Sequence, residues 1–545
     1  MLLINKSGQL QNQESCTAYT FDKTCYYVNG FIFTSGKKAG AETINWLNEC
    51  LRESDEIPFD SLMGAFSLFI VFPDGRITAF TDNSGQHAIY IHDKAISDSL
   101  LDLIDYLTTD ERLNLKFSSE ALAESYSLGR VFCGKTLIQG ITLSDSFQQY
   151  TVANGMLSEG KKPIINIDCG APDFSPDVFF TDLAYALTGF PVSVALTGGY
   201  DSRMVYAFLR NRRKVTPSLS GDCMTEPDIV TAKKVAQSVD DRLNLIETKK
   251  PDISAALLQR IFNGNDGECD LVSPSTYRLS QFYEKLSAQG FCVHITGDGG
   301  VLHKDWEWMQ DLPFYNKKHT NMERFYHQRL AYLKNTSYAG PSIKNEIAGM
   351  KGKILAYMEQ YRRESNTKSY DMLYYYVNGR RECQYNIQPS GVIQYAPLLE
   401  KRFVAYSYVL PRRKRFFYNN MRRLTTMQNE TIAKIPTCYG TTASSEAICI
   451  IRDIFMQCID YFKKFIRMIG RKYLKKNLFV SAVTTWKVRE ELNAEPISQA
   501  AVQFCVEQGY MNEEARVGDL SDAQLAFAIR VFMLQERINA KHKPE

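Results

Sequence analysis

The sequence lacks the features of membrane-spanning, secreted and nucleic-acid-binding proteins. Its longest apolar run, 65–72, is far shorter than the roughly 20 residues of a spanning helix. The amino terminus, MLLINKSGQLQNQES, has no apolar core of signal-peptide length. Lys and Arg number 64 against 61 Asp and Glu, so no global field attracts nucleic acid or an anionic membrane. We therefore expect a cytoplasmic protein with no nucleic-acid partner and no membrane partner.

Signatures of metal sites and disulfide frameworks are missing too. The 13 cysteines include no CxxC pair, and the seven histidines form no HExxH motif. We therefore expect neither a disulfide framework nor a zinc ribbon, and most cysteines should be buried reduced thiols. The chemistry should not depend on a transition metal.

The composition is that of a large globular protein. Hydrophobic residues make up 44%, aromatic residues 12% and charged residues 23% of the 545 positions, which excludes collagen-like and wholly disordered chains. The length predicts about three to four ordinary domains, or two large ones. No internal repeat is present.

The first region reads as strand-rich. Short apolar or alternating segments, interrupted by Gly, Asn and Asp, occupy 25–33, 64–72, 75–81 and 87–92. A helix is expected over 118–128, followed by two more short strands. Residues 156–178 collect Gly, Pro and Lys and lose periodicity, which predicts a linker and a domain boundary near residue 170.

After this boundary, strands alternate with helices. Strands are expected at 192–196, 215–220, 242–248 and 291–296, with helices at 202–214 and 227–239. This alternation predicts a parallel sheet, which binds ligands at the carboxyl ends of its strands. Beyond about residue 320 the pattern is mostly helical, and 498–540 should form two more helices.

The strongest local signal is the segment Leu196-Thr197-Gly198-Gly199-Tyr200-Asp201-Ser202-Arg203, between an expected strand and an expected helix. Two glycines allow a tight turn, and the amino end of the following helix favours an anion such as pyrophosphate. Thr197 and Ser202 add hydroxyl groups. An Asp inside a phosphate cradle needs a cation such as Mg²⁺ beside it. The spacing differs from GxxxxGK[ST], so this is not that nucleotide-binding loop.

Thr197 to Ser202 resembles the SGGxDS loop of the ATP pyrophosphatases, which split ATP between its α and β phosphates, and specifically of the asparagine synthetase group. Glu226-Pro227-Asp228 is similar to that family's acidic turn, and Thr296-Gly297-Asp298-Gly299-Gly300 to its second glycine-rich loop. Residues 378–411 resemble a later family stretch. Segments 27–32, 62–66, 82–85 and 136–141 resemble the landmarks of its glutaminase domain.

The resemblance implies an α/β two-domain fold. Residues 1–165 would form a degenerate Ntn-hydrolase-like, β-rich sandwich. Residues 175–545 would form a parallel-sheet, adenine nucleotide α-hydrolase-like ATP pyrophosphatase domain with a helical extension.

Two departures distinguish this chain from the family pattern. A glutaminase of this class uses an amino-terminal cysteine, whereas position 2 here is Leu2, and too few residues precede Asn29 for the glutamine-binding strands. Cys16 would need cleavage to replace it. We therefore expect a scaffold domain without ammonia production. In the second loop, the family's acidic metal ligand is replaced by Val301, leaving Asp298 as the candidate, with Asp305 a more distant one.

The resemblance also implies a reaction and its residues. ATP and Mg²⁺ are the expected cofactors for adenylating a carboxylate, which an amine then attacks to give an amide. Asp201 and Lys434 are the candidate catalytic residues, and Asp201 and Asp298 the candidate metal ligands. Arg203 would either add positive charge to the site or be a solvated helix residue. The predicted ATP and pyrophosphate contacts are Leu196, Thr197, Gly198, Gly199, Tyr200, Asp201, Ser202, Gly297, Asp298 and Gly299.

Three functions stay open. The shortened first domain and the length resemble the lasso-peptide cyclases, with β-lactam synthetases as further relatives, so the substrate would be a peptide or specialised metabolite carrying both acid and amine. A leader-peptide-binding or protease partner would fit this. One alternative is an amidotransferase that uses external ammonia on a surface-glycan sugar acid or small metabolite. The other is a catalytically inactive nucleotide-binding scaffold.

Two basic segments could line a substrate groove or form solvated helix faces. The first comprises Arg412, Arg413, Lys414, Arg415, Arg422 and Arg423. The second comprises Lys463, Lys464, Arg467, Arg471, Lys472, Lys475 and Lys476.

Overall fold

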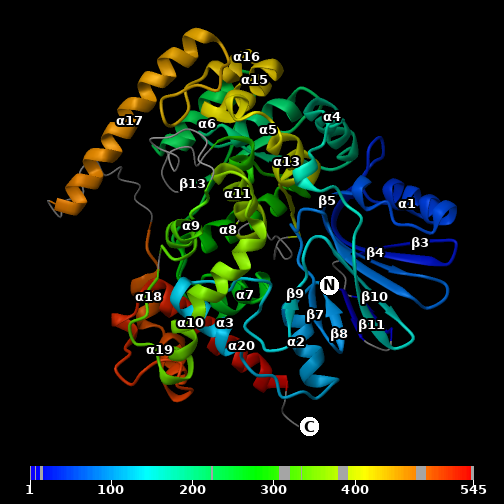
Figure 1. Ribbon diagram of the computed structural model, residues 1–545, viewed down its shortest axis with the longest axis vertical. Helices are drawn as coiled ribbons and strands as arrows, with labels where there is room; N and C mark the ends of the chain where they lie inside the picture. Colours follow the sequence, from blue (N-terminus) through cyan, green and yellow to red (C-terminus); the bar gives the residue numbers. More distant parts are fainter. Residues whose placement is uncertain are drawn as a thin grey trace.

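The structure is a computed structural model that describes residues 2–5, 8–12, 16–221, 225–305, 319–332, 334–378, 391–473 and 486–541. Within these residues it is an α/β protein with two antiparallel sheets in the amino-terminal region and one parallel sheet after it. The antiparallel sheets form one side of the molecule, and helix α17 extends away from the opposite upper edge (Figure 1). No helix among these residues is long and apolar enough to cross a bilayer.

The two antiparallel sheets confirm the expected strand-rich region. Their orders are β2-β1-β8-β7-β9 and β11-β10-β6-β5-β4-β3. The sheets share a buried cluster in which Ile4 and Ile96 of the smaller sheet join Phe69 and Ile77 of the larger. The strands are β1 (Leu2–Asn5), β2 (Leu10–Asn12), β3 (Thr17–Phe21), β4 (Thr24–Phe33), β5 (Met63–Val71), β6 (Ile77–Thr81), β7 (Tyr90–His92), β8 (Ala95–Ser97), β9 (Thr142–Leu143), β10 (Gln148–Ala153) and β11 (Met156–Lys161).

One expectation about this region was wrong. Residues 156–161 are strand β11 and not linker, because Asn154 and Gly155 both adopt positive φ, 50° and 71°, and make the tight turn of a hairpin with β10. Strands β1, β2 and β3 precede Asn29, and the expected lack of the glutamine-binding strands stays a prediction. The helices here are α1 (Ala41–Ser54), α2 (Leu100–Thr109) and the predicted α3 (Ser119–Leu128).

The parallel sheet has the order β14-β13-β12-β15-β16. All four of its strand pairings are parallel, so the predicted alternation of strands and helices is confirmed. Its strands are β12 (Val192–Ala195), β13 (Thr216–Gly221), β14 (Asn244–Glu247), β15 (Val293–Ile295) and β16 (Ile393–Tyr395). The helices nearest to it in the sequence are α4 (Pro176–Ala186), α5 (Asp201–Arg210), α6 (Pro227–Gln237), α7 (Ala255–Gly264) and α8 (Pro274–Ala288).

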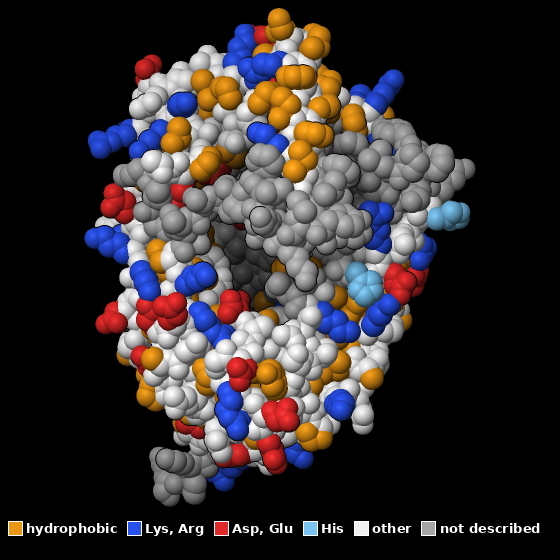
Figure 2. All heavy atoms as spheres, turned by 90° about the vertical axis from the view of Figure 1, so that its left-hand side faces the viewer, with side chains coloured by type: hydrophobic (Ala, Val, Ile, Leu, Met, Phe, Trp, Pro, Cys, Tyr) orange, Lys and Arg blue, Asp and Glu red, His pale blue; other side chains and the backbone are white. Residues whose placement is uncertain are grey.

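The region after residue 320 is mostly helical, as expected. Its α-helices are α9 (Met322–Phe325), α10 (Pro341–Met358), α11 (Asn366–Leu373), α13 (Lys401–Tyr408), α14 (Arg412–Arg415), α15 (Asn419–Gln428), α16 (Glu430–Lys434), α17 (Ala447–Tyr473), α18 (Arg489–Ala494), α19 (Pro496–Glu507) and α20 (Asp522–Lys541). Helices α19 and α20 are the two expected in the tail. Helix α17 leaves Ile448, Ile451, Phe455 and Phe462 exposed, and apolar side chains gather at the top of the face in Figure 2.

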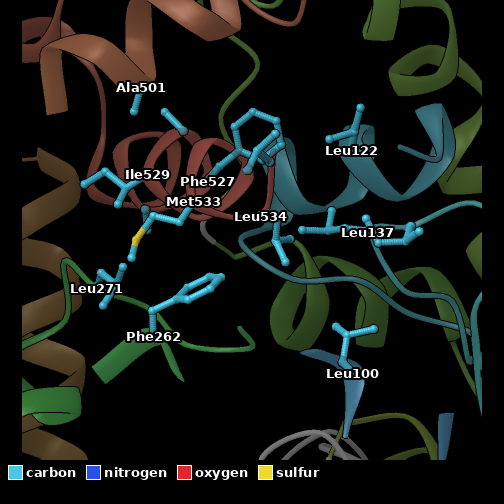
Figure 3. Close-up of a cluster of buried hydrophobic side chains, with 14 of the residues drawn as sticks. Leu100, Leu122, Leu137, Phe262, Leu271, Ala501, Phe527, Ile529, Met533 and Leu534 are labelled. Carbon is cyan, nitrogen blue, oxygen red and sulfur yellow. The ribbon is translucent and has the colours of Figure 1, made fainter. Parts of the chain in front are cut away.

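The largest core joins segments that are far apart in the sequence. Leu100, Leu122 and Leu137 from the amino-terminal region pack in one cluster with Phe262 and Leu534 (Figure 3). Packing therefore continues across the expected boundary near residue 170, and the division into two domains stays a prediction. The cysteines in the described part of the chain form no disulfide, and Cys505 alone among them is fully buried, so burial of most cysteines was wrong.

Residues in and directly after two of the amino-terminal landmarks, 62–66 and 82–85, lie where that region contacts the parallel sheet. Gln86 and the backbone of Ala396 exchange two hydrogen bonds, of 2.8 and 3.3 Å. The buried carboxyl group of Glu400 accepts hydrogen bonds from the Gly64 N–H at 2.8 Å and the Tyr395 hydroxyl at 2.9 Å. Gly64 has φ 124°, and a Cβ there would lie 1.9 Å from a carbonyl oxygen of β4. These landmarks therefore hold the two regions together.

Candidate functional site

The first glycine-rich loop connects the carboxyl end of β12 to the amino end of α5, where the sequence predicted an anion site. Its hydroxyl groups close the loop: Thr197 Oγ1 lies 2.9 Å from Ser202 Oγ, which also accepts the Thr197 N–H at 3.0 Å. The Gly199 N–H donates to Thr197 Oγ1 at 3.3 Å. The loop is therefore preformed, with two hydroxyl groups beside a helix amino terminus that favours negative charge.

Gly198 connects this loop to two other segments. Its N–H donates to Asp228 Oδ1 at 2.8 Å, which brings the Glu226-Pro227-Asp228 turn against the loop. Its carbonyl oxygen accepts the Cys438 N–H at 3.1 Å. A Cβ at position 198 would lie 2.6 Å from that Asp228 oxygen, so only glycine fits here. The Gly198 N–H is already bonded in this arrangement, and an anion would compete with Asp228 for it.

The second glycine-rich loop follows β15, the strand paired directly with β12. A Cβ added at Gly297 would lie 2.5 Å from the Ser202 nitrogen, and one at Gly300 would lie 2.1 Å from the Asp201 Cγ. Only glycines allow such an approach, so the structure brings the two predicted loops into direct contact at the carboxyl ends of neighbouring parallel strands. Ligands bind at this position in open α/β sheets.

A lysine that follows the second loop, Lys304, forms an ion pair with Asp201 of the first loop. Lys304 Nζ lies 3.0 Å from Asp201 Oδ1 and 2.9 Å from Asp201 Oδ2. The pair keeps some solvent contact, with 13% of the Lys304 side chain and 28% of the Asp201 side chain exposed. Sequence reasoning did not identify Lys304. The available signal was a cation shortly after the loop, but only the one-turn helix η3 (Gly300–His303) brings it back to Asp201.

Tyr200 is held by segments from the carboxyl-terminal half. Its ring stacks on Tyr418 at 4.4 Å, and its hydroxyl donates to Thr441 Oγ1 at 2.6 Å. That hydroxyl also accepts a hydrogen bond from Arg422 at 3.1 Å, and buried Arg422 pairs at 2.8 Å with Asp453 of α17. Burial raises the pKa of Tyr200 to about 12, so its hydroxyl stays protonated at neutral pH. Leu196, at the start of the same loop, is fully buried in the core.

Other predicted site residues make contacts of their own. Lys434 is half-exposed and forms ion pairs with Glu430 and Glu446. Asp298 is exposed and accepts the Thr296 hydroxyl at 2.8 Å, while Gly299 packs against Leu399. These findings place the residues but leave their roles as predictions.

Arg203 is neither a charge in the site nor a solvated residue, as the sequence had suggested. It is fully buried, and its guanidinium donates to the carbonyl oxygens of Ile432, Ile435 and Pro436. Burial lowers its pKa to about 10. Arg203 therefore fixes the chain that leads to Cys438.

Part of the first basic segment balances buried carboxylates at the edge of a cavity that Arg412 and Arg415 line. Arg412 pairs with buried Asp305, which is thereby unavailable as a metal ligand, and Arg415 pairs with buried Asp371 at 2.6 Å. In the second segment Lys463 is exposed on α17, whereas Lys475 and Lys476 lie outside the described residues.

The residues around Asp201 do not fit a divalent cation at that carboxylate as they are arranged. Both oxygens of Asp201 are bonded to an ammonium group, which would repel a second cation. Position 301, where a further carboxylate would be needed, is Val301, whose half-buried side chain packs against an apolar cluster. A metal ion here would have to displace Lys304.

Comparison with known proteins identifies the fold unit that carries these loops. Residues 186–426 match the family model described as Asparagine synthase. No curated protein matches the chain. The matched range begins at the end of α4 and contains both glycine-rich loops, the Asp228 turn and the Tyr418 contact. Members of this family are ATP-dependent carbon–nitrogen ligases that typically use Mg²⁺ with ATP. Residues 186–426 of the chain therefore form an asparagine synthetase-like domain of the ATP pyrophosphatase-type, amide-forming ligase class.

Proposed function

We propose that this chain is an AMP-forming amide ligase that adenylates a carboxylate of a peptide or specialised metabolite and joins it to an amine of the same substrate. One observation carries the proposal: two glycine-rich loops meet at the carboxyl ends of the neighbouring strands β12 and β15, around the amino terminus of α5. This is where an α/β sheet binds a nucleotide's phosphates.

The proposed reaction has two steps. A substrate carboxylate oxygen attacks the α phosphorus of ATP, the bond from that phosphorus to the bridging oxygen breaks, and pyrophosphate leaves. The amine nitrogen then attacks the acyl carbon, and AMP departs as the amide forms. Thr197, Ser202 and the backbone N–H groups at the start of α5 would bind the leaving pyrophosphate. Their preset donors stabilise its charge without reorganising.

A nearby cavity supports binding of a substrate group beside the loops. It has a volume of about 350 Å³ and is lined by Asp305, Ser365, Tyr408, Pro411 and Arg412, among others. Asp305 directly follows Lys304, so this cavity adjoins the second loop. The volume lies at the small end of the range for ligand sites, roughly 300–1,000 Å³, and suits one or two side chains of a longer substrate. A leader-peptide-binding or protease partner would present such a substrate.

The test is the fate of α-labelled ATP incubated with the protein and an extract of its native host. Release of labelled AMP, dependent on the protein, supports adenylation, whereas labelled ADP alone contradicts it. Fractions that stimulate AMP release then lead to the substrate. A requirement for added ammonium would favour the amidotransferase alternative, because an intramolecular reaction carries its own amine.

One observation favours the scaffold alternative. Val301 stands where the family has an acidic metal ligand, and Lys304 is paired with the carboxylate of Asp201, the other candidate ligand. Tight ATP binding without AMP release in any fraction would support a nucleotide-binding scaffold over a ligase.

A further inference from the structure

We infer that the ammonium group of Lys304 is the cation that links Asp201 to the phosphates of ATP in this chain, in the place where a divalent ion would otherwise bridge them. This inference rests on the proposed function, because it assumes that ATP binds at the two loops. It adds a positioning and phosphate-binding residue that the glycine-rich motifs do not contain.

The geometry leaves Lys304 one donor for a ligand. An ammonium group has three N–H donors, and two are directed at the two oxygens of Asp201. The ring of Tyr418 lies 5.3 Å from Nζ, within range of a cation–π contact that also favours the charged form. The third N–H can donate to a phosphate oxygen. Lysine is a common phosphate binder because its ammonium is a compact point charge.

The backbone around Lys304 is fixed, so the ammonium is held in place before a ligand arrives. The carbonyl oxygen of Lys304 accepts a hydrogen bond from Arg415 at 3.2 Å, and the guanidinium of Arg415 is anchored by buried Asp371. On the other side, the buried ring of His303 lies 2.6 Å from the Ser407 hydroxyl and 2.7 Å from the Leu398 carbonyl oxygen. Preset charge of this kind costs little reorganisation when phosphate binds.

The same geometry disfavours a metal ion bound by Asp201. A divalent ion bound to Asp201 would be repelled by the ammonium of Lys304, which contacts the same carboxylate. The apolar side chain of Val301 offers no further ligand. Without Lys304, by contrast, Asp201 would face the phosphates as an unpaired negative charge. Only then should ATP binding need a divalent ion at this position.

The test measures ATP binding by isothermal titration calorimetry, in EDTA and in Mg²⁺, for wild type, Lys304→Met and Lys304→Arg. Wild type should bind ATP in EDTA with an affinity within about tenfold of that in Mg²⁺. Lys304→Met should bind roughly 10- to 100-fold more weakly in EDTA, the range expected for one charged hydrogen bond, and Mg²⁺ should restore most of the loss. Lys304→Arg keeps a cation beside Asp201 and should stay close to wild type.

Lys351→Met is the matched control, because Lys351 is an exposed lysine that pairs with Glu323 on α9. Its ATP affinity should equal that of wild type in both buffers. Melting curves for each variant separate loss of binding from loss of folding. If Lys304→Met does not fold, the comparison of wild type with Lys304→Arg in EDTA still decides, because both must bind.

Three results would overturn the inference, and they differ in whether the proposed function also fails. If wild type and Lys304→Met depend on Mg²⁺ to the same degree, Lys304 is not the cation, but the proposed function stands. If Lys304→Met binds ATP more tightly than wild type in both buffers, Lys304 obstructs the site. If no variant binds ATP in either buffer, the inference and the proposed function fail together.

Discussion

The two glycine-rich loops lie against each other, yet they differ in how closely they follow the family pattern. The first keeps its glycines, hydroxyls and Asp201, and its Gly198 binds the Asp228 turn. The second keeps the glycines that allow the close approach but has Val301 instead of an acidic residue and contributes Lys304 instead. Backbone shape is thus retained in both loops, while the ion chemistry of the second has changed.

The largest expected effect comes from removing the group that the two loops share. Asp201→Ala should lower AMP release from α-labelled ATP by about 100- to 1,000-fold, the loss typical of one preset charge-stabilising contact, because Lys304 loses the carboxylate that positions it. The melting temperature shows whether the variant folds. Full AMP release by a folded Asp201→Ala protein would show that Asp201 of the first loop is not needed for the reaction.

Pushing the two loops apart should have the next largest effect on ATP binding. In Gly300→Ala the new Cβ would lie 2.1 Å from the Asp201 Cγ, so the second loop must move. Overpacking of this kind costs about 1–3 kcal/mol of stability, and ATP affinity should fall with it. The matched control is Gly349→Ala, at an exposed position on α10 where nothing lies within 4 Å of the added Cβ, and its stability should rise by up to about 1 kcal/mol. Equal behaviour of the two variants would show that the loops do not depend on this contact.

The stability of the protein should depend on pH through Glu400, which lies near the second loop. Glu400 is buried behind it, and burial raises the pKa of its carboxyl group to about 8. Because the folded pKa lies above the unfolded value of about 4.3, its contribution to stability is full below that value and is lost as pH rises through 8. Glu400→Gln should remove this loss, so its urea midpoint should change less between pH 5 and 9 than that of wild type. A wild-type midpoint that rises over this interval would contradict the assignment.

The smallest effect is expected at Lys434, the late cation that the sequence offered for pyrophosphate. Its ion pairs with Glu430 and Glu446 are exposed, so Lys434→Ala should leave ATP affinity in EDTA unchanged while Lys304→Met lowers it. Titration calorimetry on the two variants makes this contrast. A large loss of ATP affinity in Lys434→Ala, with no loss in Lys304→Met, would show that Lys434 and not Lys304 is the phosphate-binding cation.

The sequence predicted the parallel sheet well because each element signals itself locally. Alternating apolar strands and helices marked β12 to β15, and the glycines marked both loops. A local signal was also present, and overlooked, in the Asn154-Gly155 turn that makes β11 a strand. The division of the chain into two domains was based on composition, on the loss of periodicity over 156–178 and on the family resemblance, and it stays a prediction. The core in Figure 3 contains residues from both parts of the chain.

The charges of the site could not be predicted because they depend on contacts distant in the sequence. Arg203 follows Asp201 by two positions, yet it is buried and binds carbonyl oxygens more than 200 residues away. Asp201 meets Lys304 across 103 residues, through a turn of η3 that no motif announces. Residue type and spacing therefore located the loops, while the partner of each charge required the fold.

The most direct measurement is an experimental structure of the protein with ATP in the absence of divalent ions. We expect the phosphates at the amino end of α5, with a phosphate oxygen within hydrogen-bond distance of Lys304 Nζ and Asp201 still paired to that lysine. Phosphates bound elsewhere would contradict the proposed function. Phosphates bound at the loops with Lys304 turned away from Asp201 would contradict the role assigned to the second loop.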